Sequence, residues 1–528
     1  MSFRFLIIFF LFQKFTYAQI EDAWVYFNDK PNYEYFIENP LLILSQKSIE
    51  KKVLKNISID YRDVPINESY IQHINDHEGI EILSKSKWLN CVHIRGNYNH
   101  INELLNFDFI DRIDYANRSI NRDNDFSNKD KFGNIEYHES IRSPIDQIQM
   151  INLDFLHNNG FTGSGITIGV FDAGFRNVDN MQGFNRLRNL GNIKYTYDFV
   201  DRTEDLFSYT GNSHGTNVLS IIAGFIEGEY YGTAIDAEFY LFRTEDVSSE
   251  NPIEESYWVE AMERADSLGI DVANTSLGYR IYNNSSYSYS QEEMDGNTAF
   301  ITRGSNIAYE KGIILVNSAG NSAANGIIAP ADSEGVLSIG AVDSFGNYAS
   351  FSSQGNNFQQ IIKPDISARG SGTYLINSLD NVVQGSGTSY SSPIIAGSIA
   401  CLLQSTPSLT NNQIMDILRY TASQYESPDY YLGHGIPDFE LAYRLGLNVH
   451  ENSFFIFPNS VEDELNIIST FDKEFEIKLF DISGKLLLSK KTNGLKNILN
   501  MYNYHKGIYI LEIKYNNGNS EIFKIVKN

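Results

Sequence analysis

The chain has 528 residues, of which 42% are hydrophobic and 20% charged. Its 41 Lys and Arg stand against 66 Asp and Glu, a formal net charge of −25 at pH 7. This charge argues against nucleic acid as a partner, because a polyanion repels phosphate backbones. Two cysteines exclude a disulfide scaffold and a cysteine-built zinc site. We therefore expect a large, acidic, globular protein with several domains.

Residues 1–18 have the layout of a secretory signal peptide. Arg4 supplies a positive charge, an apolar run follows over 5–12, and Ala18 offers a small residue for cleavage. The alternative is a membrane anchor, which needs about 20 apolar residues. No later segment is long and apolar enough to be a transmembrane segment. The sequence thus predicts an exported protein, extracellular or at the cell surface.

The segment 19–130 mixes polar stretches with short apolar runs, and we treat it as a domain of its own. Near its end, 121–131 reads Asn-Arg-Asp-Asn-Asp-Phe-Ser-Asn-Lys-Asp-Lys. Such a solvated stretch is typical of a linker and a proteolysis site, or simply of a long loop between domains.

The middle of the chain, 140–446, alternates apolar strands with helical patterns. Trp258, Met262, Ala265 and Leu268 follow one another at helical spacing. The expected strands are Gly165–Phe171, Glu238–Arg243, Asp271–Ser276, Gly312–Asn317 and Val336–Val342. This alternation predicts an α/β domain, a parallel sheet with helices on both faces, whose active site lies at the carboxyl ends of the strands.

The last segment, 453–528, reads as a small β-sandwich. In Ile508–Tyr515 alternate residues are apolar or aromatic, which places them on one face of a strand. A turn at 516–519 and a second run, Ile522–Val526, complete a hairpin. A short linker near 448–452 would join this domain to the middle one.

Three short motifs in the middle domain carry residues suited to catalysis. Asp172 ends the apolar strand of Gly-Val-Phe-Asp-Ala-Gly, and His214 stands in Ser-His-Gly-Thr before an apolar helical pattern. Ser389 lies in Gly-Ser-Gly-Thr-Ser-Tyr-Ser-Ser-Pro, which opens another apolar helix. Pro393 fits the first turn of that helix, where its missing N–H costs little.

Together these three side chains make up a nucleophilic catalyst. Serine needs an adjacent base to remove its proton, histidine suits that task, and a buried carboxylate orients the imidazole. Each motif alone is common, since strand-end Asp, His-Gly pairs and helix-capping Ser all occur for structural reasons. Asn321, in Val-Asn-Ser-Ala-Gly-Asn, could donate its side-chain amide to a developing oxyanion, together with the N–H of Ser389. A turn-forming Asn is the alternative.

With these residues in place, the chain resembles the subtilisin-like serine proteases, or subtilases. The chain order Asp, His, Ser is that of subtilisin, and Gly-Thr-Ser-Tyr-Ser differs from the Gly-x-Ser-x-Gly of esterases. Four further matches follow in the family's order: Thr-Ser-Leu-Gly at 275–278, Ala-Ser-Phe-Ser-Ser-Gln-Gly at 349–355, Lys-Pro-Asp at 363–365 and Gly-His-Gly-Ile-Pro-Asp at 433–438.

The resemblance implies a fold, an activity and the roles of individual residues. It implies a subtilisin-like parallel sheet preceded by an α+β propeptide and followed by the β-sandwich. It assigns the triad to Asp172, His214 and Ser389, and the oxyanion donor to Asn321. The residues it implies for substrate binding are an edge segment that pairs with extended peptide, Ser276, Leu277 and Gly278, and one pocket wall, Ala319 and Gly320.

Three positions depart from the family's usual pattern. Ala173 replaces Thr or Ser after the aspartate, Asn217 replaces His in the helix after His214, and Tyr390 replaces Met after the nucleophile. None of these changes removes a proton-transfer group, so we expect activity to survive.

The flanking segments resemble parts that accompany such enzymes. The N-terminal segment resembles a subtilase propeptide, a folding aid and temporary inhibitor; its removal would leave the mature enzyme with Cys401 and without Cys91. The C-terminal segment resembles the sorting domain of the type IX secretion system, with Phe-Pro-Asn-Ser at 457–460, where Ser460 replaces a usual Pro, and Lys-Ile-Val-Lys at 524–527. An appended sandwich that binds a surface or a sugar is the alternative.

We therefore expect a secreted, self-maturing serine endopeptidase. Its partners would be protein or peptide substrates, its own propeptide and, through the C-terminal domain, the secretion machinery. The chemistry requires no cofactor; structural calcium is common in the family, and the sequence names no metal ligands. The alternatives are an inactive subtilase-fold adhesion or binding protein and, more remotely, an esterase.

Overall fold

The computed structural model describes residues 20–118, 134–136, 143–448, 454–457, 460–469, 474–494, 496–515 and 520–528. They divide into two compact units, one up to Asp438 and one from Phe439 onward, which we take separately. The expected signal peptide, the polar stretch 121–131 and the turn at 516–519 lie outside the described residues. The domain boundaries stay predictions.

The C-terminal unit is a β-sandwich that follows one helix, α13 (Phe439–Asn448). One sheet has the order β17-β19-β22 and the other the order β18-β24-β23-β20-β21. Their bounds are β17 Phe454–Phe457, β18 Ser460–Val461, β19 Glu464–Ser469, β20 Phe475–Asp481, β21 Leu486–Thr492, β22 Lys496–Asn500, β23 Gly507–Tyr515 and β24 Ser520–Lys527. Between the sheets pack apolar side chains of both, among them Leu465, Ile467, Ile477, Leu511 and Ile513.

The predicted hairpin of this unit is confirmed. Strands β23 and β24 pair antiparallel, with Ile508 opposite Val526. Along β23 the side chains of Tyr509, Leu511 and Ile513 are buried while their neighbours are partly or fully exposed, which is the alternation expected of a strand with one face on a core.

The first unit is built around a parallel sheet of seven strands, in the order β14-β13-β12-β11-β6-β10-β7. The strands are β6 Thr167–Asp172, β7 Ile193–Asp198, β10 Glu238–Arg243, β11 Val272–Thr275, β12 Ile314–Ser318, β13 Val336–Val342 and β14 Ile366–Arg369. All five predicted strands are present, two with the predicted bounds. The half-exposed edge strand β7 and the four-residue β14 carry no long apolar run, so the apolar pattern did not reveal them.

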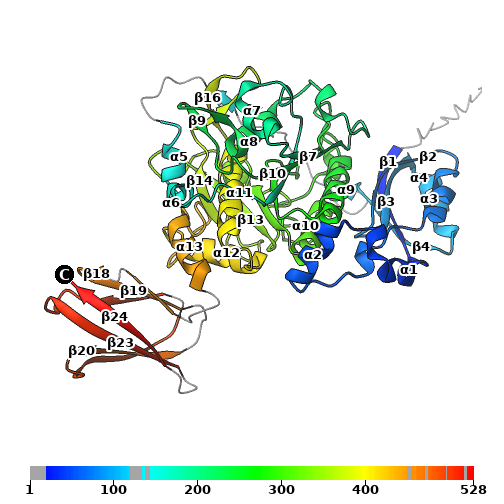
Figure 1. Ribbon diagram of the computed structural model, residues 1–528. Helices are drawn as coiled ribbons and strands as arrows, with labels where there is room; N and C mark the ends of the chain where they lie inside the picture. Colours follow the sequence, from blue (N-terminus) through cyan, green and yellow to red (C-terminus); the bar gives the residue numbers. More distant parts are fainter. Residues whose placement is uncertain are drawn as a thin grey trace, which may run out of the picture. The chain divides into compact units, whose positions relative to one another are not determined.

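Helices cover both faces of this sheet, as predicted (Figure 1). Helices α8 (His214–Ala223) and α11 (Thr388–Ser405) pack on each other and on one face, with α12 (Asn411–Tyr420) after them in the chain. The other face carries α9 (Ile253–Leu268) and α10 (Phe300–Glu310). No helix within the described part of the chain has both the length and the apolar character needed to cross a bilayer.

Smaller elements complete this unit. The helices are α5 Asp146–Gln149, α6 Leu153–Asn158 and α7 Asn185–Asn189. The strands are β5 Asn134–Glu136, β8 Phe225–Ile226, β9 Tyr230–Tyr231, β15 Thr373–Ile376 and β16 Val382–Ser386. The antiparallel sheet β15-β16-β5 leads directly into α11.

The strand order places a crevice at the carboxyl end of β6. Strand β6 is flanked by β10 on one side and by β11 on the other, so the strands that follow β6 in the chain lie on both sides of it. In open parallel sheets such a switch point is where ligands bind. Asp172 ends β6 and Thr275 ends β11, which brings the loops that follow them to the same edge.

The N-terminal domain, defined here as residues 20–118, is an α+β layer, as predicted. Its antiparallel sheet has the order β2-β3-β1-β4. The strands are β1 Ile20–Phe27, β2 Ile80–Ser86, β3 Cys91–Asn97 and β4 Ile110–Tyr115; the helices are α1 Tyr33–Glu38, α2 Gln46–Leu54, α3 Glu68–Asn75 and α4 Tyr98–Glu103. Cys91 and Cys401 are both buried and free.

One face of this sheet lies on α9 and α10 (Figure 1). The Trp24 ring stacks on Phe300 with centroids 4.7 Å apart, and its indole N–H donates to Ser256 Oγ at 2.9 Å. Lys52 pairs with Asp266 at 2.8 Å where both side chains are buried. The contact is therefore a packed interface held by rings and by paired charges.

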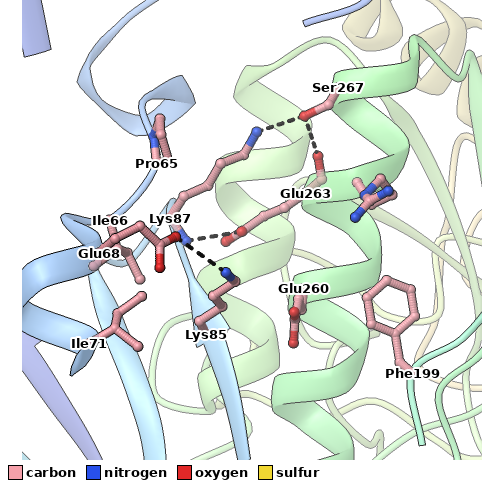
Figure 2. A pocket seen from close by; sticks show the side chains of 11 residues that line it. Pro65, Ile66, Glu68, Ile71, Lys85, Lys87, Phe199, Glu260, Glu263 and Ser267 are labelled. Atoms are coloured by element: carbon pink, nitrogen blue, oxygen red, sulfur yellow. Dashed lines mark hydrogen bonds and ion pairs between the residues drawn. The ribbon is translucent and has the colours of Figure 1, made fainter. Parts of the chain in front are cut away.

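Glu263 of α9 is the polar centre of this interface. Its carboxylate accepts hydrogen bonds from Ser86 Oγ (2.6 Å) and from the backbone N–H groups of Lys87 (2.9 Å) and Trp88 (3.0 Å). Burial raises the pKa of Glu263 to about 7, against the opposing charge of Lys87. Figure 2 shows this carboxylate beside a cavity of about 160 Å³, where the ammonium of Lys87 reaches Ser267 Oγ at 2.7 Å.

This carboxyl should make the interface sensitive to pH. Because packing raises the pKa of Glu263 above its ordinary value of 4.5, the packed state binds more protons between the two values. The stabilisation of the packed interface by protonated Glu263 is complete at pH values below the ordinary pKa and is lost as the pH rises through about 7. We predict that hydrogen-exchange protection of the Lys87 and Trp88 amides, measured in the full chain carrying Ser389→Ala, falls between pH 5 and pH 8, an interval chosen to bracket that pKa.

Glu263→Gln is the matched control, since glutamine still accepts hydrogen bonds but does not titrate. The protection of these amides in Glu263→Gln should depend less on pH than in the parent protein, which separates the effect of Glu263 from that of other titrating groups. Protection that rises with pH through neutrality in the parent would contradict the prediction.

Candidate active site

The end of β6 and the start of α8 meet at Asp172 and His214. Nδ1 of His214 lies 2.7 Å from Oδ1 of Asp172, and both side chains are buried. The same carboxylate oxygen accepts the backbone N–H of Ala173 at 2.7 Å. Because a carboxylate can only accept, this contact keeps the ring proton on Nδ1 and leaves Nε2 as the basic nitrogen.

The approach of these two elements depends on Gly215. A Cβ atom at this position would lie 2.7 Å from the carbonyl oxygen of Gly174 and 2.9 Å from Cβ of Asp172. Thr216 then donates its hydroxyl to the carbonyl of Arg176 at 2.8 Å, which fastens the first turn of α8 to the loop after β6. The His-Gly-Thr motif thus sets the spacing between base and carboxylate.

Ser389, the second residue of α11, lies beside the end of β11. Its Oγ donates to the carbonyl of Ser276 at 3.1 Å, and the hydroxyl of Ser276 donates to the carbonyl of Ser389 at 2.9 Å. The next residue, Tyr390, sets its ring 6.1 Å from the imidazole of His214, centroid to centroid. Ser389 therefore directly precedes the residue whose ring lies beside His214, and His214 contacts Asp172.

The predicted place of Pro393 in the first turn of α11 is wrong. The helix begins at Thr388, so Pro393 lies inside it, in the second turn. Proline has no N–H, and its position leaves the carbonyl four residues earlier, that of Ser389, without its helical donor. The hydroxyl of Ser276 supplies the missing hydrogen bond, which explains why a helix can carry a proline here.

Asn321 follows β12 and is held by the residue before Ser389. Its Oδ1 accepts the backbone N–H of Thr388 at 2.9 Å and the hydroxyl of Thr388 at 3.0 Å. That hydroxyl also accepts the N–H of Gly320 at 3.2 Å. With its oxygen engaged in this way, the amide of Asn321 has Nδ2 left as its donor.

The two segments predicted to bind substrate face each other across Ile328. A Cβ added to Gly278 would lie 2.5 Å from this side chain, and one added to Gly320 would lie 3.1 Å from it. Leu277 and Ala319 are buried beneath these glycines. Ile328 is partly exposed and comes from an irregular loop, so no sequence pattern pointed to it as a pocket residue.

Two of the three departures from the family pattern contact each other. The side-chain amide of Asn217, one turn into α8, hydrogen-bonds to the hydroxyl of Tyr390. Burial raises the pKa of Tyr390 to about 12, and this hydrogen bond opposes the shift. The two changes are far apart in the sequence, but in the structure their side chains form a hydrogen-bonded pair beside His214. Ala173 contributes its backbone N–H alone to Asp172.

In the residues that the structure describes, no cluster of three or more His, Cys, Asp and Glu side chains is arranged to hold a metal ion. Structural calcium stays a prediction.

Comparison with known proteins covers all three parts of the chain. Residues 163–435 match the subtilase family model, 22–131 match the peptidase S8 propeptide domain of Bacteroidota, and 455–528 match a secretion system C-terminal sorting domain.

Individual relatives match the central part. The alkaline protease of Alkalihalobacillus alcalophilus is 30% identical over 301 residues, which cover 56% of this chain and 69% of that protein. Subtilisin Savinase of Lederbergia lenta is 30% identical over 301 residues, 56% of this chain and 97% of that protein. Among solved structures, the MycP3 protease from the type VII (ESX-3) secretion system has a TM-score of 0.47 at 21% identity, over 60% of this chain and 92% of that one.

The reciprocal pair of serines should be coupled to the proline. Ser276→Ala leaves the buried carbonyl of Ser389 without a donor, which costs about 1–3 kcal/mol of unfolding free energy. Pro393→Ala returns an N–H to the helix, so the cost of Ser276→Ala should shrink in that background. Urea unfolding of the four proteins of this cycle, followed by tryptophan fluorescence, measures the coupling. If Ser276→Ala lowers the unfolding free energy equally with proline and with alanine at position 393, the Ser276 hydroxyl does not replace the N–H that Pro393 lacks.

Proposed function

The chain belongs to the subtilase family of serine endopeptidases, and we propose that Asp172, His214 and Ser389 are its catalytic triad. It is an exported protein with an S8 propeptide and a sorting domain. The observation that carries the proposal is the buried 2.7 Å contact between Asp172 and His214, with Ser389 at the adjoining helix start.

In the proposed reaction His214 is the general base. Nε2 takes the proton of Ser389 as Oγ attacks the carbonyl carbon of the scissile peptide bond, and Asp172 stabilises the imidazolium that forms. Oγ must first leave the carbonyl of Ser276, to which it donates in this structure. Such a change of partner is expected, because catalytic hydrogen bonds tighten only when substrate is bound.

The tetrahedral intermediate carries a negative oxygen that needs donors. We assign this task to Nδ2 of Asn321 and to the backbone N–H of Ser389, the second because N–H groups in the first turn of a helix lack helical acceptors. His214 then returns its proton to the leaving amine, which departs. Water, activated by the same imidazole, hydrolyses the acyl-enzyme and restores Ser389.

Substrate would lie along Ser276–Gly278 as an added strand, with the residue before the cut between Gly278 and Gly320. Ile328 occupies the space between these two glycines. We therefore propose that the Ile328 side chain limits the size of the residue accepted before the cut, with Ser353 Oγ also close to Gly320.

The N-terminal domain would act as inhibitor until the enzyme cuts it away, and the C-terminal domain would present the chain to the secretion machinery. An inactive binding protein is the alternative, and the complete set of triad residues weighs against it. That the chemistry needs no cofactor stays a prediction.

Ser389→Ala tests the triad. The purified variant should neither react with an active-site serine phosphonate nor cleave peptides, and it should keep its propeptide while the wild type loses it. Ser398→Ala is the matched control, because it removes a buried hydroxyl from the same helix, bonded only to the carbonyl of Ile394. Mass spectrometry of both proteins reports labelling and maturation. A Ser389→Ala protein that cleaves peptides like the wild type would show that the triad is wrongly assigned.

Ile328→Ala tests the pocket. The shorter side chain opens the space between Gly278 and Gly320, so kcat/KM for a peptide with Phe before the cut should rise relative to that for the matching Ala peptide. Leu379→Ala, at an exposed leucine, is a control with the same kind of truncation. An unchanged Phe-to-Ala ratio in Ile328→Ala would place the pocket elsewhere.

A further inference from the structure

Arg118, near the end of the N-terminal domain, sets its guanidinium against the catalytic part of the chain. The guanidinium carbon lies 3.8 Å from the ring centroid of Tyr289, and Nη1 lies 2.8 Å from the carboxylate of Glu293. The side chains of Arg118 and Glu293 are only 25% and 20% exposed. A ring face and a carboxylate together form a site that suits a planar cation.

A second carboxylate stands behind the ring. Glu255 of α9 is fully buried and accepts the hydroxyls of Tyr282 (2.5 Å) and Tyr289 (2.9 Å) as well as the N–H of Ile301 (2.9 Å). Burial raises the pKa of Glu255, while these hydrogen bonds and the charge of Arg118 act in the opposite direction. A cation in front of Tyr289 therefore also stabilises the ionised form of Glu255.

Tyr289 and Glu293 are each bonded within the catalytic part, while the loop that carries them also contacts the N-terminal domain, where the Tyr287 hydroxyl donates to Glu21 at 3.3 Å. Tyr289 is 1% exposed, donates its backbone N–H to the carbonyl of Arg280 at 2.8 Å, and accepts the N–H of Phe300 at its hydroxyl at 3.2 Å. Glu293 accepts the N–H of Ser290 at 2.9 Å within its own loop. None of these three hydrogen bonds involves Arg118, so Tyr289 and Glu293 keep them when the propeptide leaves.

Its position follows from the substrate-binding segment. Ser276 contacts Ser389, Gly278 borders the pocket for the residue before the cut, and Arg280 pairs with Tyr289. Going from 276 to 280 therefore leads away from the nucleophile toward residues that precede the cut. A fully extended chain advances about 3.3 Å per residue, so these four steps span at most about 13 Å, the reach of four residues of an extended substrate.

We propose that Tyr289, Glu293 and Glu255 form a subsite for an arginine side chain of the substrate, about four or five residues before the cut. The propeptide fills it with Arg118 until the propeptide is removed. Lysine should bind less well, because a compact ammonium cannot stack on the ring and pair in a plane as a guanidinium does. The inference rests on the endopeptidase function proposed above.

Arginine and citrulline peptides test the subsite, because citrulline has nearly the shape of arginine without its charge. Matched fluorogenic pairs carry one or the other at each position from the third to the sixth before a fixed cut. Active enzyme prepared from the full chain should show kcat/KM for arginine exceeding that for citrulline about tenfold at one of these positions, the size of a largely buried charge-assisted pair.

The variant Glu293→Gln should bring the arginine-to-citrulline ratio toward one. Glu334→Gln makes the same change in charge at an exposed residue outside the subsite and should keep the wild-type ratio. Because the readout is a ratio on one enzyme preparation, partial loss of folded protein does not alter it.

Equal kcat/KM for arginine and citrulline at every position would overturn the subsite and leave Arg118 as a propeptide contact only. A preference that persists in Glu293→Gln would also overturn it. Failure of the endopeptidase assignment looks different: the wild type then cleaves no peptide faster than Ser389→Ala, and both proposals fall.

Discussion

The contact between Asp172 and His214 is the constraint on which the rest of the site depends. It requires a carboxylate at the end of the central strand β6 and a helix start within hydrogen-bond reach, an approach that leaves no room for a Cβ at position 215. The sheet order supplies the first requirement, since β6 lies between β10 and β11 at the switch point. The location of the base is thus a consequence of strand order, and α8 and α11 are packed on each other around it.

The nucleophile is positioned by a different device. Helix α11 carries a proline in its second turn, and the carbonyl that this proline leaves without a donor belongs to Ser389 itself. The hydroxyl of Ser276 donates a hydrogen bond to that carbonyl, and the hydroxyl of Ser389 donates one to the carbonyl of Ser276. A local defect in the helix therefore ties the nucleophile to the segment where substrate is expected to lie.

The strands and motifs that could be predicted from the sequence are those in which one strong local pattern decides the structure. Strands β10 and β13 have the predicted bounds because most of their residues are apolar. The motifs around Asp172, His214 and Ser389 could be found because their chemistry needs rare combinations. The half-exposed strand β7 has no such pattern. Ile328 and the joined pair of Asn217 and Tyr390 depend on distant loops meeting, which residue type and spacing do not encode. Pro393 was misplaced because the compensating donor lies 117 positions away in the chain.

The face of α9 that lies under the N-terminal sheet would be exposed to water if the N-terminal domain were removed. Its side chains there are mostly polar, with Ser256, Glu260, Glu263 and Asp266 each bonded to the covering domain. If the N-terminal domain is removed, these groups would gain water in place of their partners, and Phe300 and Tyr289 would add aromatic rings to the new surface. The uncovered face would thus carry the carboxylates of Glu260, Glu263 and Asp266, and this shared negative charge would keep copies of the enzyme apart.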